Sequence, residues 1–143
     1  MIELAFTVKP LWGWLIMQGI KDVENRAHGV NPPRGTCAVT FSKVYSRGEY
    51  EDCLACLRDS MGYSVKKLKA LPTYEELAEF RGKLVGIVDY EVAPTSGSKW
   101  YQSGSVAWKV SNPRWLKTPF PVTGFVNMWH LKPADAKKVG SVR

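Results

Sequence analysis

Hydrophobic positions in the first third of the chain follow two different periods. Apolar residues alternate from Ile2 to Val8, and a two-residue period predicts a half-buried strand. Residues 10–18 are rich in large apolar side chains, begin with a proline and are followed by Gly19, which is typical of a short helix. Residues 22–26 and 36–42 are predicted strands, separated by a loop that contains prolines and a glycine.

The remainder of the chain predicts further helices and strands. A helix is expected over residues 49–61, and Thr73 with Glu76 forms the capping-box pattern of a second short helix. Three more strands are predicted, over residues 84–92, 105–110 and 124–131. Residues 134–143 follow Pro133, are mostly small or polar, and are expected to form a helical fragment or a loose tail.

This order of elements indicates the fold class. About six strands and three helices without regular alternation favour an α+β domain or a partly open barrel over a doubly wound sheet. A length of 143 residues fits one hydrophobic core, so we expect residues 1–143 to form a single domain.

Composition narrows the classes of partner. The chain has a formal charge of +7 and a pI near 9.4, which attract polyanions such as nucleic acid. The lysines and arginines are thinly spread, with denser groups at Lys66, Lys67, Lys69, Lys137, Lys138 and Arg143. Such groups are also common on ordinary solvated surfaces. We predict no membrane span and no signal peptide, and therefore a cytoplasmic protein.

Three cysteines suit a reducing compartment better than a disulfide framework. Cys53 and Cys56 have the CxxC spacing of a zinc site, and Cys37 is a potential third ligand to the metal. Zinc would need a fourth ligand, whereas His28 and His130 are isolated from each other. We therefore place Cys53 and Cys56 on the helix over residues 49–61, whose apolar positions have helical spacing, and predict no metal and no cofactor.

The segment from Gly19 to Arg26 concentrates the chemistry of the chain. Alternation on a strand puts Glu24 and Arg26 on one face. Lys21 lies between the predicted helix end at Gly19 and this strand. Charges beside a core are costly to bury unless they pair, so they are often kept for a ligand. The alternative is a surface ion pair. Trp12 lies just upstream, and an aromatic ring beside a basic group can stack on a nucleobase.

These residues carry a resemblance to a known family. Trp12-Gly13-Trp14 followed by Gly19-Ile20-Lys21-Asp22-Val23-Glu24-Asn25-Arg26 resembles the motif of the ASCH domain family, within the PUA-like superfamily. Further blocks resemble the family in the expected order, at residues 34–35, 38–43, 80–82, 86–88, 108–116 and 119–122, and Gly124 and Trp129 fit its final strand. Phe41 departs from the pattern, because many members carry a histidine-alanine pair before the serine that corresponds to Ser42.

The resemblance implies a fold and a ligand site. It implies a PUA-like pseudo-barrel of about six strands with flanking short helices, and a cleft that binds RNA or a nucleotide, including a modified base. Residues expected in that site are Trp12, Lys21, Glu24, Arg26, Ser42, Lys43 and Trp108. Trp12 or Trp108 would stack on the base, Lys21 would neutralise a phosphate and Glu24 would accept from an exocyclic amine. Arg26 would orient Glu24 or bind phosphate itself.

Two other function classes stay open. Some ASCH-type proteins resemble ribonucleases, and a small bacterial branch hydrolyses N(4)-acetylcytidine with lysine, threonine and glutamate. Lys21 matches that lysine, but Glu24 stands where the branch has threonine. Lys21 and Glu24 would be the catalytic pair of such a hydrolase, with Ser42 or Thr40 as nucleophile. The third class is a coregulator or protein-interaction module.

Overall fold

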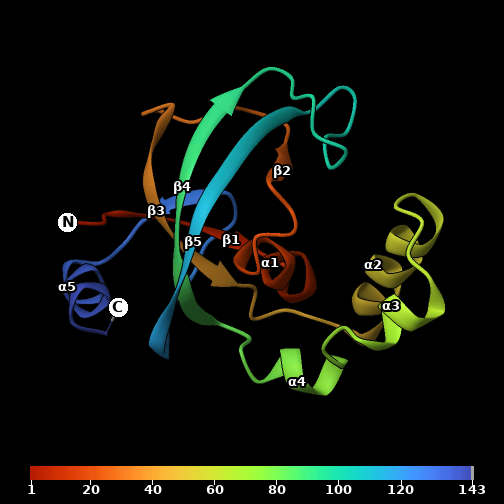
Figure 1. Ribbon diagram of the computed structural model, residues 1–143. Coiled ribbons are helices and arrows are strands. Elements are labelled where there is room, and N and C mark those ends of the chain that lie inside the picture. Colours follow the sequence, from red (N-terminus) through yellow and green to blue (C-terminus); the bar gives the residue numbers. More distant parts are fainter. Residues whose placement is uncertain (143) are drawn as a thin grey trace.

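The computed structural model describes residues 1–142 and places six strands and five helices in that range (Figure 1). In chain order these elements are β1 (Leu4–Val8), α1 (Pro10–Met17), β2 (Val23–Arg26), β3 (Arg34–Phe41), α2 (Arg47–Asp59), α3 (Val65–Lys69), α4 (Tyr74–Ala78), β4 (Lys83–Ala93), β5 (Val106–Pro121), β6 (Met128–His130) and α5 (Pro133–Val142).

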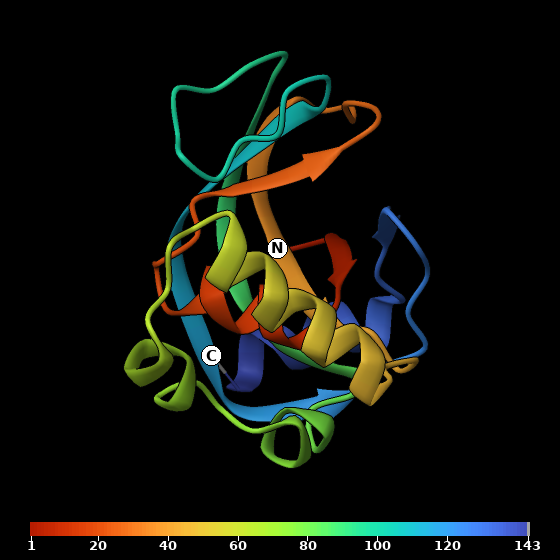
Figure 2. The ribbon, with the colours of Figure 1, turned by 90° about the vertical axis from the view of Figure 1, so that its right-hand side faces the viewer.

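All six strands belong to one mixed sheet, in the order β2-β5-β4-β3-β1-β6. β1 runs parallel to β3, with Ala5 opposite Ala38, and the other neighbouring pairs are antiparallel. The sheet curls into a half-barrel (Figures 1 and 2). This confirms the predicted α+β class with a curled, barrel-like sheet.

Helix α1 is apolar around its circumference, and a helix of this kind is buried by more than one neighbour. Ile16 and Met17 pack against the sheet in a cluster that includes Phe6 and Val39. Leu11 and Leu15 pack in a second cluster with residues of α2. The helix therefore lies between the sheet and α2, and it links the two clusters.

Gly13 allows α1 to approach the sheet closely. A Cβ atom at this position would lie 2.4 Å from the ring of Phe41 and 2.7 Å from the side chain of Val8. Both neighbours are themselves buried, so a larger residue would require β1 and β3 to move. This glycine thus fixes the height of Trp12 and Trp14 above the sheet.

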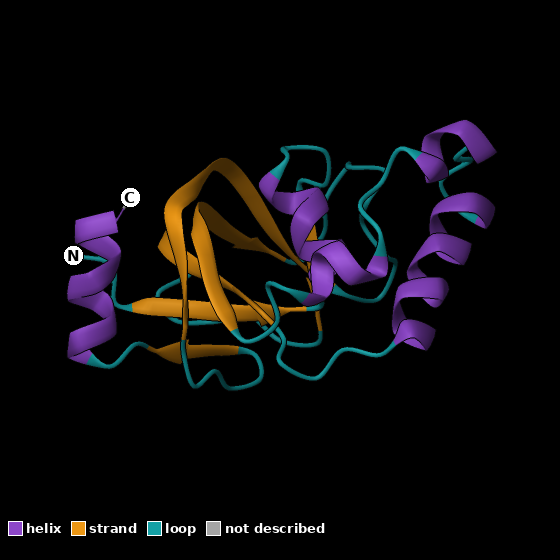
Figure 3. Ribbon diagram, turned by 90° about the horizontal axis from the view of Figure 1, so that it is seen from below, coloured by secondary structure: helices purple, strands orange, loops and turns teal. Residues whose placement is uncertain are grey.

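Helices lie at both ends of the curled sheet (Figure 3). α2 and α3 lie at one end, and α5 lies at the other end beside both termini (Figures 1 and 3). α5 is helical rather than loose, since Ala136 and Val139 are buried against the sheet residues Leu84 and Ile87. Among the described residues, a helix with the length and apolar content of a transmembrane span is absent.

Strand β5 is longer than the sequence analysis predicted. The predicted strand ended at Val110, before Asn112 and Pro113. The strand instead continues to Pro121, with Asn112 at a φ of 51° beside an irregular step in the pairing with β4. β2 pairs only with residues 106–109, so the remainder of β5 is an edge, where proline is tolerated.

Two other elements differ from prediction. The last strand was expected over residues 124–131 but is confined to β6, because Asn127 has a left-handed φ of 62° that interrupts it. Helix α3 was not predicted. Ser64 caps this helix by accepting a hydrogen bond from the amide of Lys67 at 3.1 Å.

Candidate functional site

The motif residues follow a tight helix end. Gly19 adopts a φ of 75°, a conformation that glycine accepts most readily. The amides of Ile20 and Lys21 then donate to the carbonyl of Leu15 at 3.0 and 3.1 Å. This turn directs the chain from α1 into β2, and it buries Lys21 immediately beside the new strand.

Lys21, Glu24 and Arg26 form a continuous charged group. The Glu24 carboxylate accepts from Lys21 Nζ through Oε1 at 3.3 Å and from Arg26 Nη2 through Oε2 at 3.0 Å. Only 6%, 12% and 18% of the three side chains are exposed, in the order Lys21, Glu24, Arg26. The ion pairs are thus largely buried, which excludes an ordinary solvated surface pair.

The Nη2 atom of the Arg26 guanidinium is held by two partners. Besides Glu24, this atom donates to the carbonyl of Thr7 at 2.7 Å. The guanidinium carbon lies 5.3 Å from the centre of the Trp108 ring and 5.8 Å from that of Phe6, within the range of cation–π attraction. Both hydrogens on Nη2 are used by Thr7 and Glu24, so Arg26 orients Glu24.

Two of the three N–H donors of Lys21 have hydrogen-bond partners among the described residues. An ammonium group has three N–H donors, and two of them point to the carbonyl of Val23 and to Glu24. The Nζ atom also lies 5.7 Å from the centre of the Trp12 ring. One N–H therefore remains beside an aromatic face.

A pocket of about 410 Å³ opens over these residues. We call it the first pocket, and its walls include Trp12, Lys21, Glu24, Asn25, Cys56, Lys99 and Trp100. It lies between the start of β2, the end of α2 and the loop before β5. An aromatic wall, a lysine and a carboxylate give it both stacking and hydrogen-bonding capacity.

Two further pockets continue from the first. The second pocket, about 330 Å³, shares Trp12, Glu24 and Asn25 with the first and adds Arg26, Ser42 and Val126. The third pocket, about 290 Å³, shares Ser42 and Val126 with the second and adds Lys43 and Phe125. The structure thus brings Trp12, Lys21, Glu24, Arg26 and Ser42 together, and it places Lys43 one pocket further along.

Trp108 lies beneath the site instead of lining the first pocket. The residue is buried, with only 3% of its surface exposed, and its ring packs edge-on against Phe6. Its Nε1 atom donates a hydrogen bond to the carbonyl of His28 at 3.0 Å. The Arg26 guanidinium lies over the Trp108 ring, and Trp108 lines a smaller pocket together with Arg26 and His28. Trp108 therefore supports the guanidinium, and Trp12 is the aromatic residue that reaches the first two pockets.

Asn25 lies inside the motif and has a role that was not predicted from the sequence. The Asn25 side chain donates to the carbonyl of Trp100 at 2.9 Å and accepts from the amide of Gln102 at 2.8 Å. Ser98 Oγ likewise donates to Asp22 at 2.5 Å. These bonds hold the loop before β5 against β2, where it forms one wall of the first pocket. Trp100 and Tyr101 were the available signal, since two large aromatics are unusual in a polar loop.

The cysteines are all free thiols. Cys53 and Cys56 lie on α2 as predicted, with Cys53 buried in the core and Cys56 at the wall of the first pocket. Burial raises the pKa of the Cys53 thiol and raises that of Cys37 to about 12. Within residues 1–142, no group of three or more His, Cys, Asp or Glu side chains is arranged to hold a metal ion.

The hydroxyls considered as nucleophiles lie apart from Lys21. Thr40 is buried, and its Oγ1 donates to the carbonyl of Phe6 at 3.0 Å. Ser42 Oγ donates to the carbonyl of Val44 at 2.9 Å. Neither residue lines the first pocket.

Comparison with known proteins adds no assignment. No protein-family model matches the chain, and no curated protein matches it.

Proposed function

We propose that this chain is an ASCH-type, PUA-like domain that binds single-stranded RNA or a nucleotide, with one base in the first pocket. The observation that carries the proposal is the buried group Lys21–Glu24–Arg26 at a pocket wall shared with Trp12. A buried ion pair is weak as a stabilising device, because apolar residues of similar volume often stabilise a fold as well or better. A ligand that uses the charges gives a reason for keeping them.

Glu24 is suited to recognise a base that carries an exocyclic amine. Each carboxylate oxygen accepts one bond from within the protein, and an ionised carboxylate has about four acceptor positions. The carboxylate therefore has free acceptor positions, and Arg26 fixes its direction. Cytosine, adenine and guanine have an exocyclic amine to offer, whereas uracil has none.

Trp12 and Lys21 complete the recognition. The ring of Trp12 lines the first two pockets and supplies a stacking face for a base. Lys21 has one remaining N–H, which suits a phosphate or a base carbonyl. Lys99, an exposed residue of the first pocket, and the net charge of +7 add attraction for the phosphate backbone.

The hydrolase and the protein-interaction module are not favoured by a specific observation. The hydroxyls of Thr40 and Ser42 are bonded to backbone carbonyls outside the first pocket. We also propose a cytoplasmic location, because three free thiols suit a reducing compartment.

Salt-dependent binding of single-stranded RNA tests the proposal. Affinity should fall as salt rises, with a log–log slope of about 0.7 for each phosphate contacted. Lys21→Ala should weaken all sequences alike and reduce the slope by about one contact. Lys137→Ala is the matched control, because it removes the same charge from the exposed surface of α5. Equal losses in the two variants, or an affinity independent of salt, would contradict the proposal.

A further inference from the structure

Two apolar side chains are exposed beside the third pocket. Phe125 and Val126 have exposed fractions of 58% and 81%, and both line that pocket. Val44 lines the same pocket and is 74% exposed. Apolar residues gathered around a hollow indicate a contact surface more strongly than the same residues scattered singly.

Hydrogen bonds hold Phe125 in this exposed position. Thr7 Oγ1 donates to the carbonyl of Phe125 at 2.6 Å and accepts from Trp129 Nε1 at 3.0 Å. The Thr7 amide donates to the carbonyl of Asn127 at 3.3 Å. The Phe125 ring also packs edge-on against Trp129, with the ring centres 5.7 Å apart. The exposed ring is therefore an oriented part of the fold.

The third pocket also contains polar and basic side chains, beside further apolar residues such as Phe41 and Val122. Lys43 is exposed and forms no ion pair with the described residues. Ser42 and Thr123 add hydroxyl groups. An oriented aromatic ring beside a free lysine is the combination with which proteins bind single-stranded nucleic acid, through base stacking and phosphate attraction.

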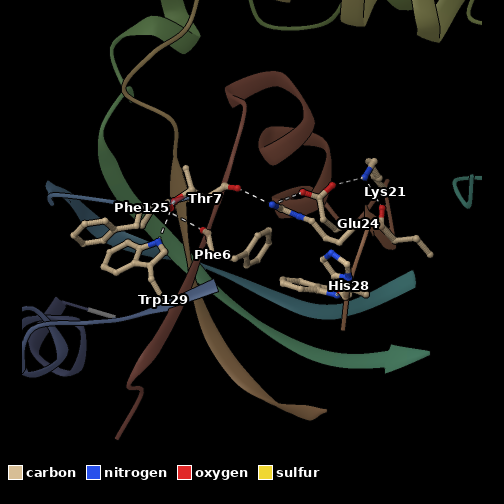
Figure 4. Close-up of polar contacts among 11 residues, drawn as sticks. Phe6, Thr7, Lys21, Glu24, His28, Phe125 and Trp129 are labelled. Atoms are coloured by element: carbon tan, nitrogen blue, oxygen red, sulfur yellow. Dashed lines mark hydrogen bonds and ion pairs between the residues drawn. The ribbon is translucent and has the colours of Figure 1, made fainter. Parts of the chain in front are cut away.

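The same residue that orients Phe125 also orients the charged group of the first pocket. Thr7 holds Phe125 through its hydroxyl, and its carbonyl accepts from Arg26, which in turn holds Glu24. Figure 4 shows Phe125 at one end of this series of contacts and Lys21 at the other. The second pocket joins the two ends, since it shares walls with both neighbours.

We infer that the third pocket binds a second nucleotide of the same single strand, with its base on Phe125 and its phosphate at Lys43. This inference rests on the proposed function, because it extends the site of the first base. The occupant is a nucleotide strand rather than an apolar protein surface, since Lys43 in the third pocket is exposed and has no ion-pair partner among the described residues, and an apolar surface would cover this charge without pairing it. The ligand is therefore a chain of at least two nucleotides.

Titrations of the whole protein with cytidine, CpU and UpC test this inference. Uridine serves as the second residue because stacking tolerates any base. One of the two dinucleotides places uridine in the third pocket when cytidine is in the first pocket. This dinucleotide should bind about 5- to 150-fold more tightly than cytidine, the range that corresponds to one stacked base. Phe125→Ala should remove that gain and leave cytidine binding unchanged, whereas Phe125→Tyr should retain it. Lys43→Gln should also reduce the gain, and Lys137→Gln should not.

The outcomes separate this inference from the proposed function. If cytidine, CpU and UpC bind equally well, or if Phe125→Ala retains the gain at the wild-type melting temperature, the second nucleotide site is wrong and the first pocket is unaffected. If none of the three ligands binds, the proposed function itself is contradicted. If sedimentation shows a dimer that Phe125→Ala dissociates, Phe125 contacts a second copy of the chain, and the inference is overturned.

Discussion

Arg26 on β2 donates a hydrogen bond of 2.7 Å to the carbonyl of Thr7 on β1, and it thereby joins strands from opposite sides of the curled sheet. β2 is one edge of the sheet, whereas β1 is next to the other edge. Backbone pairing does not connect these two strands. One guanidinium thus bridges the opening of the half-barrel while it also orients Glu24.

Replacing Arg26 by methionine should therefore destabilise the protein. The change would leave Glu24 without one of its two cationic partners in a largely buried position, and breaking such a pair costs about 2–4 kcal/mol. Arg34→Met is the matched control, because Arg34 pairs with Glu91 at 3.5 Å on an exposed surface. Its loss should cost about 0.5 kcal/mol or less. Urea unfolding measures the free energy of unfolding of both variants. Equal losses in the two variants would show that the Arg26 bridge contributes no more than a surface ion pair.

Cys56 should be the reactive thiol, and RNA should protect it. Burial raises the pKa of Cys37 to about 12 and also raises that of Cys53, so few of these thiols are thiolates at pH 8. Cys56 lies at the wall of the first pocket. Iodoacetamide should modify Cys56 about tenfold faster than the other two thiols, as peptide mass analysis can determine. Unchanged modification of Cys56 in saturating RNA would contradict the placement of the ligand.

Asp89 should make stability depend on pH in the acid range. Burial tends to raise the pKa of this carboxyl, but hydrogen bonds from Thr36, Asn112 and Arg114 outweigh burial and hold the pKa below its ordinary value of 3.8. A depressed pKa in the folded state means that the carboxylate stabilises the fold above pH 3.8, and that this contribution is lost as pH falls through the folded pKa.

Unfolding of the wild type and of Asp89→Asn at pH 7 and at pH 3 measures this effect. The variant should be less stable at pH 7 by about 1 kcal/mol or less, because the Asp89 side chain is substantially exposed. The difference should shrink at pH 3. A constant difference at both pH values would mean that the charge of Asp89 is not what stabilises the strands it joins.

Local patterns in the sequence were sufficient to predict several elements. Pro10 and Gly19 bounded α1 correctly, and the capping box of Thr73 and Glu76 is present, with bonds of 3.2 and 3.0 Å. These features depend on residues a few positions apart, so they are visible in a single sequence. The charges of Glu24 and Arg26 were also placed correctly on one strand face, since period-two alternation requires it.

Contacts between distant segments were not predictable in the same way. The continuation of β5 past Asn112 depends on β4, and the bond between Arg26 and Thr7 depends on how far the sheet curls. The burial of Trp108 beneath Arg26 has the same origin. Trp108 thus became a support for the site because tertiary packing, and not local pattern, decided which tryptophan faces the pocket.

The most direct measurement compares the affinities of cytidine and uridine for the wild type and for Glu24→Gln. Cytosine and uracil have the same size, but only cytosine presents an exocyclic amine. The wild type should prefer cytidine, and the variant should lose about 1–3 kcal/mol of that preference, the scale of a hydrogen bond to a charged group. Glutamine also offers a donor to uracil, so uridine binding should not weaken. Glu91→Gln, in the exposed pair with Arg34, should retain the wild-type preference. Equal affinities for both nucleosides in the wild type, unchanged in a Glu24→Gln protein of normal melting temperature, would contradict the assignment of Glu24 as the residue that recognises the base.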